Sequence, residues 1–170
     1  ETCPVGPYFA GAVDLIAEET YVRAFAGGTG AAKCAGNYAG SLVAARAAQA
    51  RGFHHVLWLD GAERRYVEEA GVMNVVFVIG GVVVTPPLGG TILPGITRDS
   101  VLTLLREMNV PVEERRISID EVFESHAAGL LEGAAGVGTA ATIIRVDGDA
   151  RTFGGTLSFD ENHTATVRVQ

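Results

Sequence analysis

The sequence predicts a single domain of mixed α/β or α+β architecture. Segments with strand-like patterns recur between segments with helical spacing along the whole chain. The chain has 170 residues, of which 48% are hydrophobic and 19% are charged, a composition that suits a globular protein with a sizeable core. No internal repeat or low-complexity linker divides the sequence, so one domain is expected.

The first half of the chain is expected to form several strands and one helix. Residues 20–27 alternate and predict a strand that leads into a glycine-rich loop. A helix should follow from Asn37, as its N-cap, to a stop at Gly52. Strands are then predicted over 54–60 and 64–69. The apolar run 73–86 is interrupted by paired glycines, which predicts a hairpin and not a membrane span.

The second half repeats this mixture of helices and strands. A helix should begin at the loop 94–97, with Thr97 near its N-terminus and apolar residues at helical spacing, namely Val101, Leu102, Leu105 and Met108. A strand over 111–118 and a helix over 119–133 should follow. The alternation on both sides of a turn within 155–169 predicts a closing hairpin.

Composition narrows the classes of function. The net charge of −7 and the pI near 5.0 argue against a nucleic-acid partner, because binding phosphates needs clustered Lys and Arg. Cys3 and Cys34 have no metal-ligand spacing, and two cysteines are too few for a disulfide scaffold. A reducing cytoplasm is the expected environment, and no metal site is expected.

Lys33 is the only lysine of the chain, and the other twelve basic residues are arginines. It lies in the small-residue stretch GGTGAAKCAGNYAG, residues 27–40. An arginine keeps its proton, whereas a lysine amine can lose its proton and attack a carbonyl. Lys33 is therefore a candidate nucleophile, although a chain poor in lysine must also have its last one somewhere.

Three further features have ambiguous meanings when taken singly. Residues 94–97 and 136–141 are candidate anion cradles, but glycine and threonine at a helix start are most often just a cap. The pair Glu68 and Glu69 is a candidate acid site, but acidic pairs at strand ends are usually solvated. Together with Lys33, these features supply an amine for an aldehyde, an acid for a pyridine nitrogen and donors for a phosphate. Pyridoxal phosphate requires these three groups.

Several motifs together give a specific resemblance. The segments GGTGAAKCAGNY, ERRYVEEAGVMN, LPGITRDSVL, VEERRISIDE and GTAATI occur in the order of the branched-chain amino-acid aminotransferases, of the fold-type IV class. The resemblance runs from about Val5 to Ile144. It implies that residues 1–170 form the large, cofactor-binding domain of such an enzyme, a pseudo-barrel of strands with flanking helices, and that the small N-terminal domain is absent.

The resemblance also implies roles for individual residues. Lys33 matches the lysine that forms the Schiff base with pyridoxal 5'-phosphate and moves the proton. Tyr38 matches the tyrosine that hydrogen-bonds the phenolic oxygen of the cofactor, and Glu69 the carboxylate at the pyridine nitrogen. Because neighbouring residues of a strand face opposite ways, Glu68 should point away from the cofactor.

The remaining matched residues are implied to hold the phosphate and the substrate. Ile96, Thr97 and Thr139 match the phosphate cradle, and Gly138 and Ala140 match the wall of the substrate pocket. The implied reaction is transamination of leucine, isoleucine or valine with 2-oxoglutarate or glutamate. The implied partners are the amino-acid and 2-oxo-acid substrates, a second copy in a homodimer, or a separate N-terminal domain chain.

The sequence departs from the family pattern at three positions and in length. The family's usual chain is about twice as long, and its small domain supplies an arginine to the phosphate. Val72 stands where the family has a glycine close to the cofactor, and Gly133 and Ala135 replace an acidic and an aromatic residue. Two alternatives therefore stay open: a sister activity, as a D-amino-acid aminotransferase or an aminodeoxychorismate lyase, and a non-catalytic or half-enzyme relative.

Overall fold

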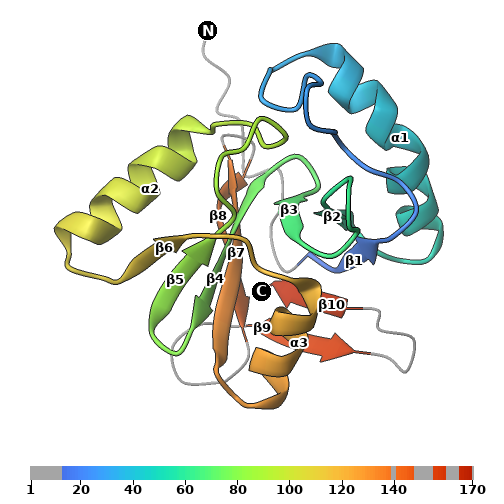
Figure 1. Cartoon of the computed structure of the whole chain (residues 1–170). Helices are drawn as coiled ribbons and strands as arrows, with labels where there is room; N and C mark the ends of the chain where they lie inside the picture. Colours follow the sequence, from blue (N-terminus) through green and yellow to red (C-terminus); the bar gives the residue numbers. More distant parts are fainter. Residues whose placement is uncertain (1–12, 139–140, 148–154, 160–164, 170) are drawn as a thin grey trace, which may run out of the picture.

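The computed structural model describes residues 13–138, 141–147, 155–159 and 165–169. Helices and strands alternate along these residues, which confirms the predicted mixed α/β class (Figure 1). The described strands form three sheets, with two, three and five strands. Within the described residues, no helix is long and apolar enough to cross a membrane.

The three-stranded sheet carries one wall of the candidate site. Its strands are β1 (Leu15–Glu18), β2 (His55–Leu59) and β3 (Val67–Ala70), with β1 parallel and β3 antiparallel to β2. The helix α1 (Ala35–Ala50) connects β1 to β2 and lies beside this sheet (Figure 1). It buries only Ala44 and Ala48, which pack against β1 and β2 residues that include Trp58.

The five-stranded sheet has the strand order β6-β5-β4-β7-β8. These strands are β4 (Asn74–Ile79), β5 (Val82–Thr85), β6 (Val112–Glu114), β7 (Leu131–Gly138) and β8 (Ala141–Asp147). The predicted hairpin is confirmed as β4 and β5, joined by Gly80 and Gly81 at φ +55° and +78°. Positive φ at both turn residues matches the twist of the strands, and glycine adopts it without steric cost.

Alternating residues of β4 pack on opposite faces of this sheet. Val75 and Phe77 belong to the largest core cluster, together with residues of β2 and β3. Val76 packs on the other face against α2 (Ile96–Glu107), through residues that include Val101 and Leu105. Because both faces are covered, β4 is apolar nearly throughout, as the sequence indicates.

The remaining elements are α3 and the closing hairpin. The helix α3 (Ile119–Ala127) begins at the N-cap Ser118, whose hydroxyl accepts a hydrogen bond from the Glu121 N–H at 3.0 Å. The strands β9 (Gly155–Phe159) and β10 (Ala165–Val169) pair antiparallel, which confirms the predicted hairpin.

Several predicted boundaries are wrong, including those of the strands over 64–69 and 111–118, which the structure has as Val67–Ala70 and Val112–Glu114. Residues 20–27 form no strand; the strand in this region is β1, and the chain after it is irregular. The two large apolar side chains of this segment, Tyr21 and Phe25, are both exposed, while the small Ala24 is buried. Helix α1 begins at Ala35 with Cys34 as N-cap, so Asn37 is not the cap, although Gly52 at φ +89° does follow the end of the helix.

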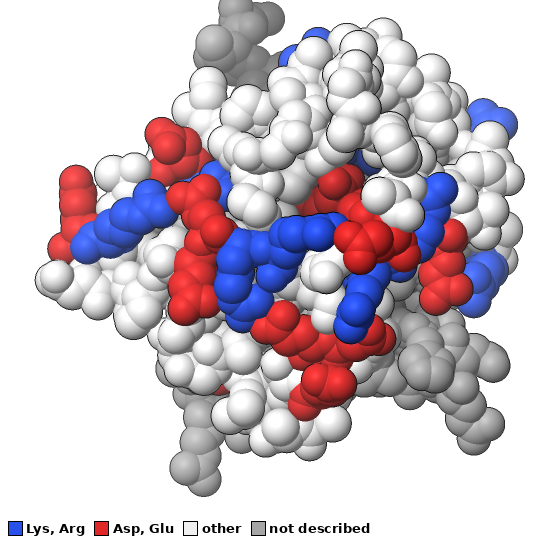
Figure 2. Space-filling view, in the orientation of Figure 1, with Lys and Arg blue, Asp and Glu red and all other residues white. Residues whose placement is uncertain are grey.

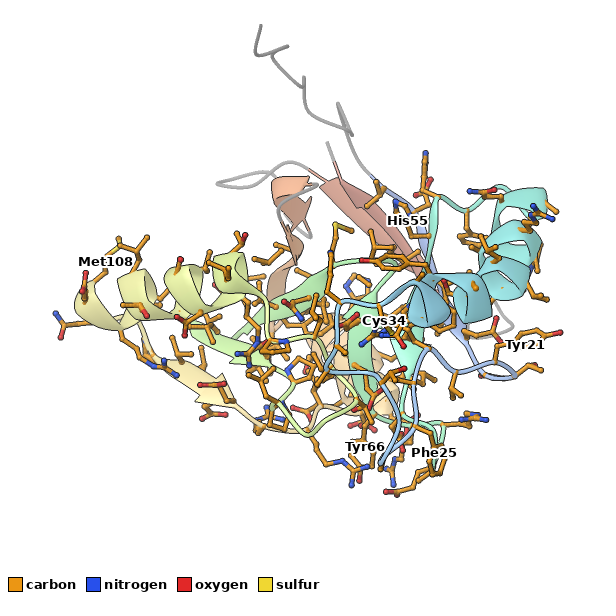
Figure 3. The ribbon with its side chains drawn as sticks, turned by 90° about the horizontal axis from the view of Figure 1, so that it is seen from above. Tyr21, Phe25, Cys34, His55, Tyr66 and Met108 are labelled. Carbon is orange, nitrogen blue, oxygen red and sulfur yellow. The ribbon has the colours of Figure 1, made fainter. Side chains whose placement is uncertain are left out.

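The other errors concern the second half of the chain. The predicted helix over 119–133 ends at Ala127, and Gly129 at φ +69° turns the chain into β7. β7 consists mainly of small residues, so local propensity did not reveal it. Met108 lies at the outer end of α2 and is exposed, so it is no part of the core (Figure 3).

Candidate active site

Lys33 lies in an irregular loop, residues 27–34, that leads into α1. The Asn37 side chain fixes this loop, because its Nδ2 donates to the carbonyls of Thr29 at 2.8 Å and Ala32 at 2.9 Å. The Thr29 hydroxyl also donates to Asn37 Oδ1 at 2.7 Å. The asparagine that sequence patterns favour as a helix cap therefore holds the lysine loop instead.

The small residues of this loop allow it to approach the segment 86–95. Gly30 lies so close to Thr91 that a Cβ at Gly30 would collide with the Thr91 backbone. Ala31 N–H donates to the Gly90 carbonyl at 3.1 Å. The glycine at position 30 is thus required for two loops, distant in sequence, to meet.

A cavity of about 430 Å³ opens beside Lys33. Its volume lies within the range of about 300–1,000 Å³ that is typical of small-molecule sites. The lining includes six of the eight residues singled out by resemblance, namely Lys33, Tyr38, Glu69, Ile96, Thr97 and Gly138. The other two, Thr139 and Ala140, lie outside the described residues. Lys33 Nζ lies 5.6 Å from the centre of the Tyr38 ring.

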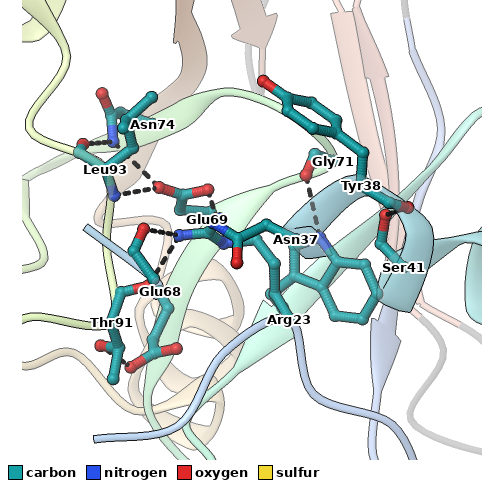
Figure 4. A network of polar contacts seen from close by, with 12 residues as sticks. Arg23, Asn37, Tyr38, Ser41, Glu68, Glu69, Gly71, Asn74, Thr91 and Leu93 are labelled. Atoms are coloured by element: carbon teal, nitrogen blue, oxygen red, sulfur yellow. Dashed lines mark hydrogen bonds and ion pairs between the residues drawn. The ribbon is translucent and has the colours of Figure 1, made fainter. Parts of the chain in front are cut away.

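Glu69 is the buried charged group of this cavity, with 3% of its surface exposed. Its Oε1 accepts hydrogen bonds from the Leu93 N–H at 2.8 Å and from Asn74 Nδ2 at 3.4 Å. Its Oε2 lies 2.8 Å from Arg23 Nε (Figure 4). Burial raises the pKa of Glu69 to about 7, although Arg23 and the Leu93 N–H act in the opposite direction. A modest change in its surroundings would therefore change its charge at neutral pH.

Glu68 is also buried, but it is not part of the cavity lining. Its Oε1 accepts a hydrogen bond from the Thr91 hydroxyl at 2.5 Å. Burial raises the pKa of Glu68, and the hydrogen bond from Thr91 opposes this effect. Neither carboxylate of the pair is solvated, and each is held by the loop that contains Thr91 and Leu93.

Helix α2 begins at the cavity. Its N-cap is Gly95, and its first hydrogen bond runs from the Asp99 N–H to the Gly95 carbonyl at 3.0 Å. The N–H groups of Ile96 and Thr97 precede that bond, so they have no acceptor within the helix. A helix start of this kind favours an anion, through its free N–H groups and its dipole. The first of the two predicted cradles thus faces the same cavity as Lys33.

The second predicted cradle, residues 136–141, is only partly described. Gly136 to Gly138 belong to the end of β7, and Ala141 begins β8. The described part of this segment is therefore strand and not the loop that the sequence suggested. Gly138 contributes to the lining of the cavity.

The three departures from the family pattern are accommodated without backbone strain. The turn between β3 and β4 places positive φ on Gly71, at +58°, and not on Val72. Val72 is half-exposed and lines the cavity, so it narrows the cavity without occupying a left-handed position. Gly133 and Ala135 lie in β7, opposite Val78 and Val76, and do not line the cavity.

Sequence reasoning missed two polar residues at this site, Arg23 and Asn74. Arg23 was assigned to a strand that does not form, so its contact with Glu69 was not foreseen. Asn74 interrupts an otherwise apolar run, and this interruption was the available signal. Its Nδ2 donates to the Leu93 carbonyl at 2.9 Å, which ties β4 to the segment before α2.

Comparisons with known proteins agree with this geometry. The sequence model of the family described as amino-transferase class IV matches residues 25–143. Branched-chain-amino-acid aminotransferase 2 of Bacillus subtilis (strain 168) is 49% identical over 167 residues. That match covers 96% of this chain but 46% of the relative, so the chain spans about half the length of the relatives it matches.

Solved structures give the same result for the fold. The branched-chain aminotransferase of the archaeon Thermoproteus uzoniensis, solved with norvaline, matches with a TM-score of 0.72 and 32% identity, over 84% of this chain and 46% of that one. The branched-chain amino acid aminotransferase of Thermobaculum terrenum, solved in its PLP form, matches with a TM-score of 0.68 and 28% identity, over 83% and 44%.

Proposed function

The chain belongs to the class IV aminotransferases, and from this premise we propose that it binds pyridoxal 5'-phosphate as part of a branched-chain amino-acid aminotransferase. The observation that supports the proposal most is the convergence of four groups on one cavity, namely the Lys33 amine, the Tyr38 hydroxyl, the Glu69 carboxylate and the start of α2. Each group suits one part of the cofactor. When bound, the cofactor supplies an electron sink for the pair left at the substrate α-carbon.

Lys33 is the group that would hold the cofactor and move the proton. As the only lysine, it has the only side-chain amine of the chain that can attack an aldehyde carbon. Its side chain is exposed to the cavity and reaches the face of the Tyr38 ring. The same amine would also take and return a proton at the substrate α-carbon.

Glu69 and the start of α2 would fix the two ends of the cofactor. An ionised Glu69 beside the pyridine nitrogen would raise the pKa of that nitrogen and keep it protonated. The N–H groups of Ile96 and Thr97, with the Thr97 hydroxyl, would bind the phosphate, together with Thr139. The Tyr38 hydroxyl would donate a hydrogen bond to the phenolic oxygen of the cofactor.

Substrate class follows from the relatives and from the lining of the cavity. The relatives named above are branched-chain aminotransferases, and one was solved with norvaline, an unbranched apolar amino acid. Here the lining includes the apolar residues Val72, Leu93 and Val137, together with Gly138. Leucine, isoleucine and valine, with 2-oxoglutarate as amino acceptor, are therefore the proposed substrates, and Gly138 and Ala140 the proposed wall beside them.

The remaining length of the relatives has a proposed role as well. The chain is proposed to be the large, cofactor-binding part, and the rest of the active site would come from a small N-terminal domain, either joined to it or supplied by a partner, and from a second copy in a homodimer. In isolation, the chain should bind cofactor but turn over slowly, because an open site neither excludes water nor orients the substrate carboxylate.

The test is chemical labelling of Lys33. The chain is incubated with pyridoxal phosphate, reduced with borohydride, digested and analysed by mass spectrometry. A pyridoxyl group on the peptide that contains Lys33, and its loss in Lys33→Arg, are expected, because arginine keeps the charge but cannot form an imine. Labelling confined to the N-terminal amine would contradict the proposal. A coupled assay with leucine and 2-oxoglutarate, with and without an N-terminal domain, then tests activity.

A further inference from the structure

Arg23 lies beside Glu69, and both line a small pocket together with Lys33 and Tyr38. Its side chain is 9% exposed, and its Nε lies 2.8 Å from Glu69 Oε2. Its Nη2 donates to two carbonyls, those of Gly30 at 2.9 Å and Thr91 at 2.6 Å (Figure 4). These two carbonyls therefore help to hold the guanidinium beside Glu69.

Thr91 is held in turn by Glu68. The Thr91 hydroxyl donates to Glu68 Oε1 at 2.5 Å, while the Thr91 carbonyl accepts from Arg23. Two residues later, the Leu93 N–H donates to Glu69. Two consecutive residues of β3 thus accept hydrogen bonds from two alternate residues of one loop. We call this arrangement a clasp. This clasp consists of Glu68, Glu69, Thr91 and Leu93.

We propose that Glu68 is a positioning residue for the cofactor site: through Thr91 it keeps Arg23 against Glu69. Glu68 touches neither the cavity nor its proposed ligand. Its importance for the cofactor rests on the function proposed above, but its effect on Glu69 does not. The expectation that Glu68 merely points away from the site is thereby extended to a structural role within it.

The charge of Glu69 depends on three neighbouring charged groups. Arg23 and Lys33 favour the ionised form, whereas Glu68 disfavours it as a like charge. Glu68 therefore has two opposite effects on Glu69. Its negative charge raises the pKa of Glu69, and its hydrogen bond to Thr91 holds the arginine that lowers it. If Glu68 acted on Glu69 only through its charge, the hydrogen bond between Glu68 and Thr91 would not affect the pKa of Glu69.

Substitutions at Thr91 and Glu68 separate these two effects. Thr91→Val keeps the shape but removes the hydroxyl, and Thr91→Ser keeps the hydroxyl. Glu68→Gln removes the charge but keeps an oxygen that can accept from Thr91. Arg23→Gln serves as the reference for complete loss of the guanidinium.

The readout is the pH titration of the Glu69 carboxyl carbon by NMR in the cofactor-free chain. Thr91→Val should raise the midpoint by about one unit, in the direction of Arg23→Gln, because the guanidinium is no longer held at the carboxylate. Thr91→Ser should restore the wild-type midpoint, and Glu68→Gln should lower it. Thr91→Ala, which also lacks the hydroxyl, should reproduce the Thr91→Val shift if the valine variant folds poorly.

The same variants are then titrated with pyridoxal phosphate by absorbance. Thr91→Val should bind it more weakly than Thr91→Ser, since an ionised Glu69 is needed at the pyridine nitrogen. An unchanged Glu69 midpoint in both hydroxyl-free variants would overturn the proposal, and so would an equal shift in Thr91→Ser. If the midpoints move as expected but no variant or wild type binds the cofactor, the clasp stands and the proposed function fails.

Discussion

Two of the arginine–carboxylate sites in the described residues differ in burial and hardly at all in distance. In the cavity, Arg23 Nε lies 2.8 Å from Glu69. At the outer site, the buried Arg98 and the exposed Arg106 lie 2.8 and 2.6 Å from Glu114, whose side chain is 34% exposed. Burial raises the pKa of Glu69 to about 7 despite its partner, whereas hydrogen bonds from Arg98 and Arg106 lower the pKa of the more exposed Glu114.

The outer site belongs to a band of charged side chains over β6, α3 and the 60–66 turn (Figure 2). Side chains of both signs alternate in this band, and its ion pairs join Arg65, Arg106, Arg115 and Arg116 to Glu63, Glu113, Glu114, Asp120 and Glu121. Water screens the charges of such exposed pairs. Their side chains stay ionised, and each pair contributes little to the free energy of unfolding. Desolvation, more than distance, therefore decides whether a paired carboxylate is poised to change its charge.

Removing one arginine from each site should have very different effects on the free energy of unfolding. Arg23→Gln should lower the free energy of unfolding by about 3–5 kcal/mol at about pH 8, because it leaves a buried carboxylate without its charge partner. Arg106→Gln should cost less than about 1 kcal/mol, since its pair is exposed and Glu114 keeps Arg98. Denaturant unfolding of both variants measures the difference, and equal losses would contradict it.

A second prediction concerns how the free energy of unfolding changes with pH. Because the pKa of Glu69 is raised to about 7 in the fold, from an ordinary value near 4.5, the folded state holds this proton more tightly than the unfolded state. The stabilisation is complete below about pH 4.5 and is lost as pH rises through about 7, by roughly 3 kcal/mol. Glu69→Gln should lack this slope. Parallel curves for wild type and Glu69→Gln would show that Glu69 titrates normally.

A third prediction concerns chemistry at the cavity. Glu69→Gln should slow the conversion of bound cofactor by leucine by about a hundredfold, since a neutral amide cannot keep the pyridine nitrogen protonated. Glu114→Gln is the matched control on the outer face and should leave the rate unchanged. Stopped-flow absorbance of the cofactor-loaded protein measures both, and a slow Glu114→Gln would indicate an effect through the fold.

The smallest expected effect is the change in the free energy of unfolding when Glu114 is substituted. Its pH dependence should be opposite to that of Glu69. Since the pKa of Glu114 is lowered in the fold, its stabilisation is present at neutral pH and is lost as pH falls below its ordinary value. Glu114→Gln should therefore cost about 1 kcal/mol near pH 7, because the amide oxygen can still accept a hydrogen bond from the buried Arg98, and nothing at about pH 2. Acid and neutral denaturant series test this, and a cost that persists in acid would indicate lost packing.

Local patterns in the sequence predicted much of the fold. The paired glycines at 80 and 81 identified a hairpin, and Gly52 identified the end of α1, because such turns depend on residues only a few positions apart. The failures at 20–27 and at β7 have the opposite cause. The alternation of residues 20–27 does not show which surface this segment will pack against. The small residues of β7 do not show it either.

The family and the residue types at the candidate site follow from the sequence alone. Lys33 as the only lysine, and the order of the motifs around it, required no structure. The tertiary structure alone decided that Arg23 reaches Thr91, 68 positions away, and Glu69, and that both glutamates are buried. The physical reason is that a carboxylate's charge depends on desolvation and on partners brought together by folding, which neighbouring residues in the sequence do not specify.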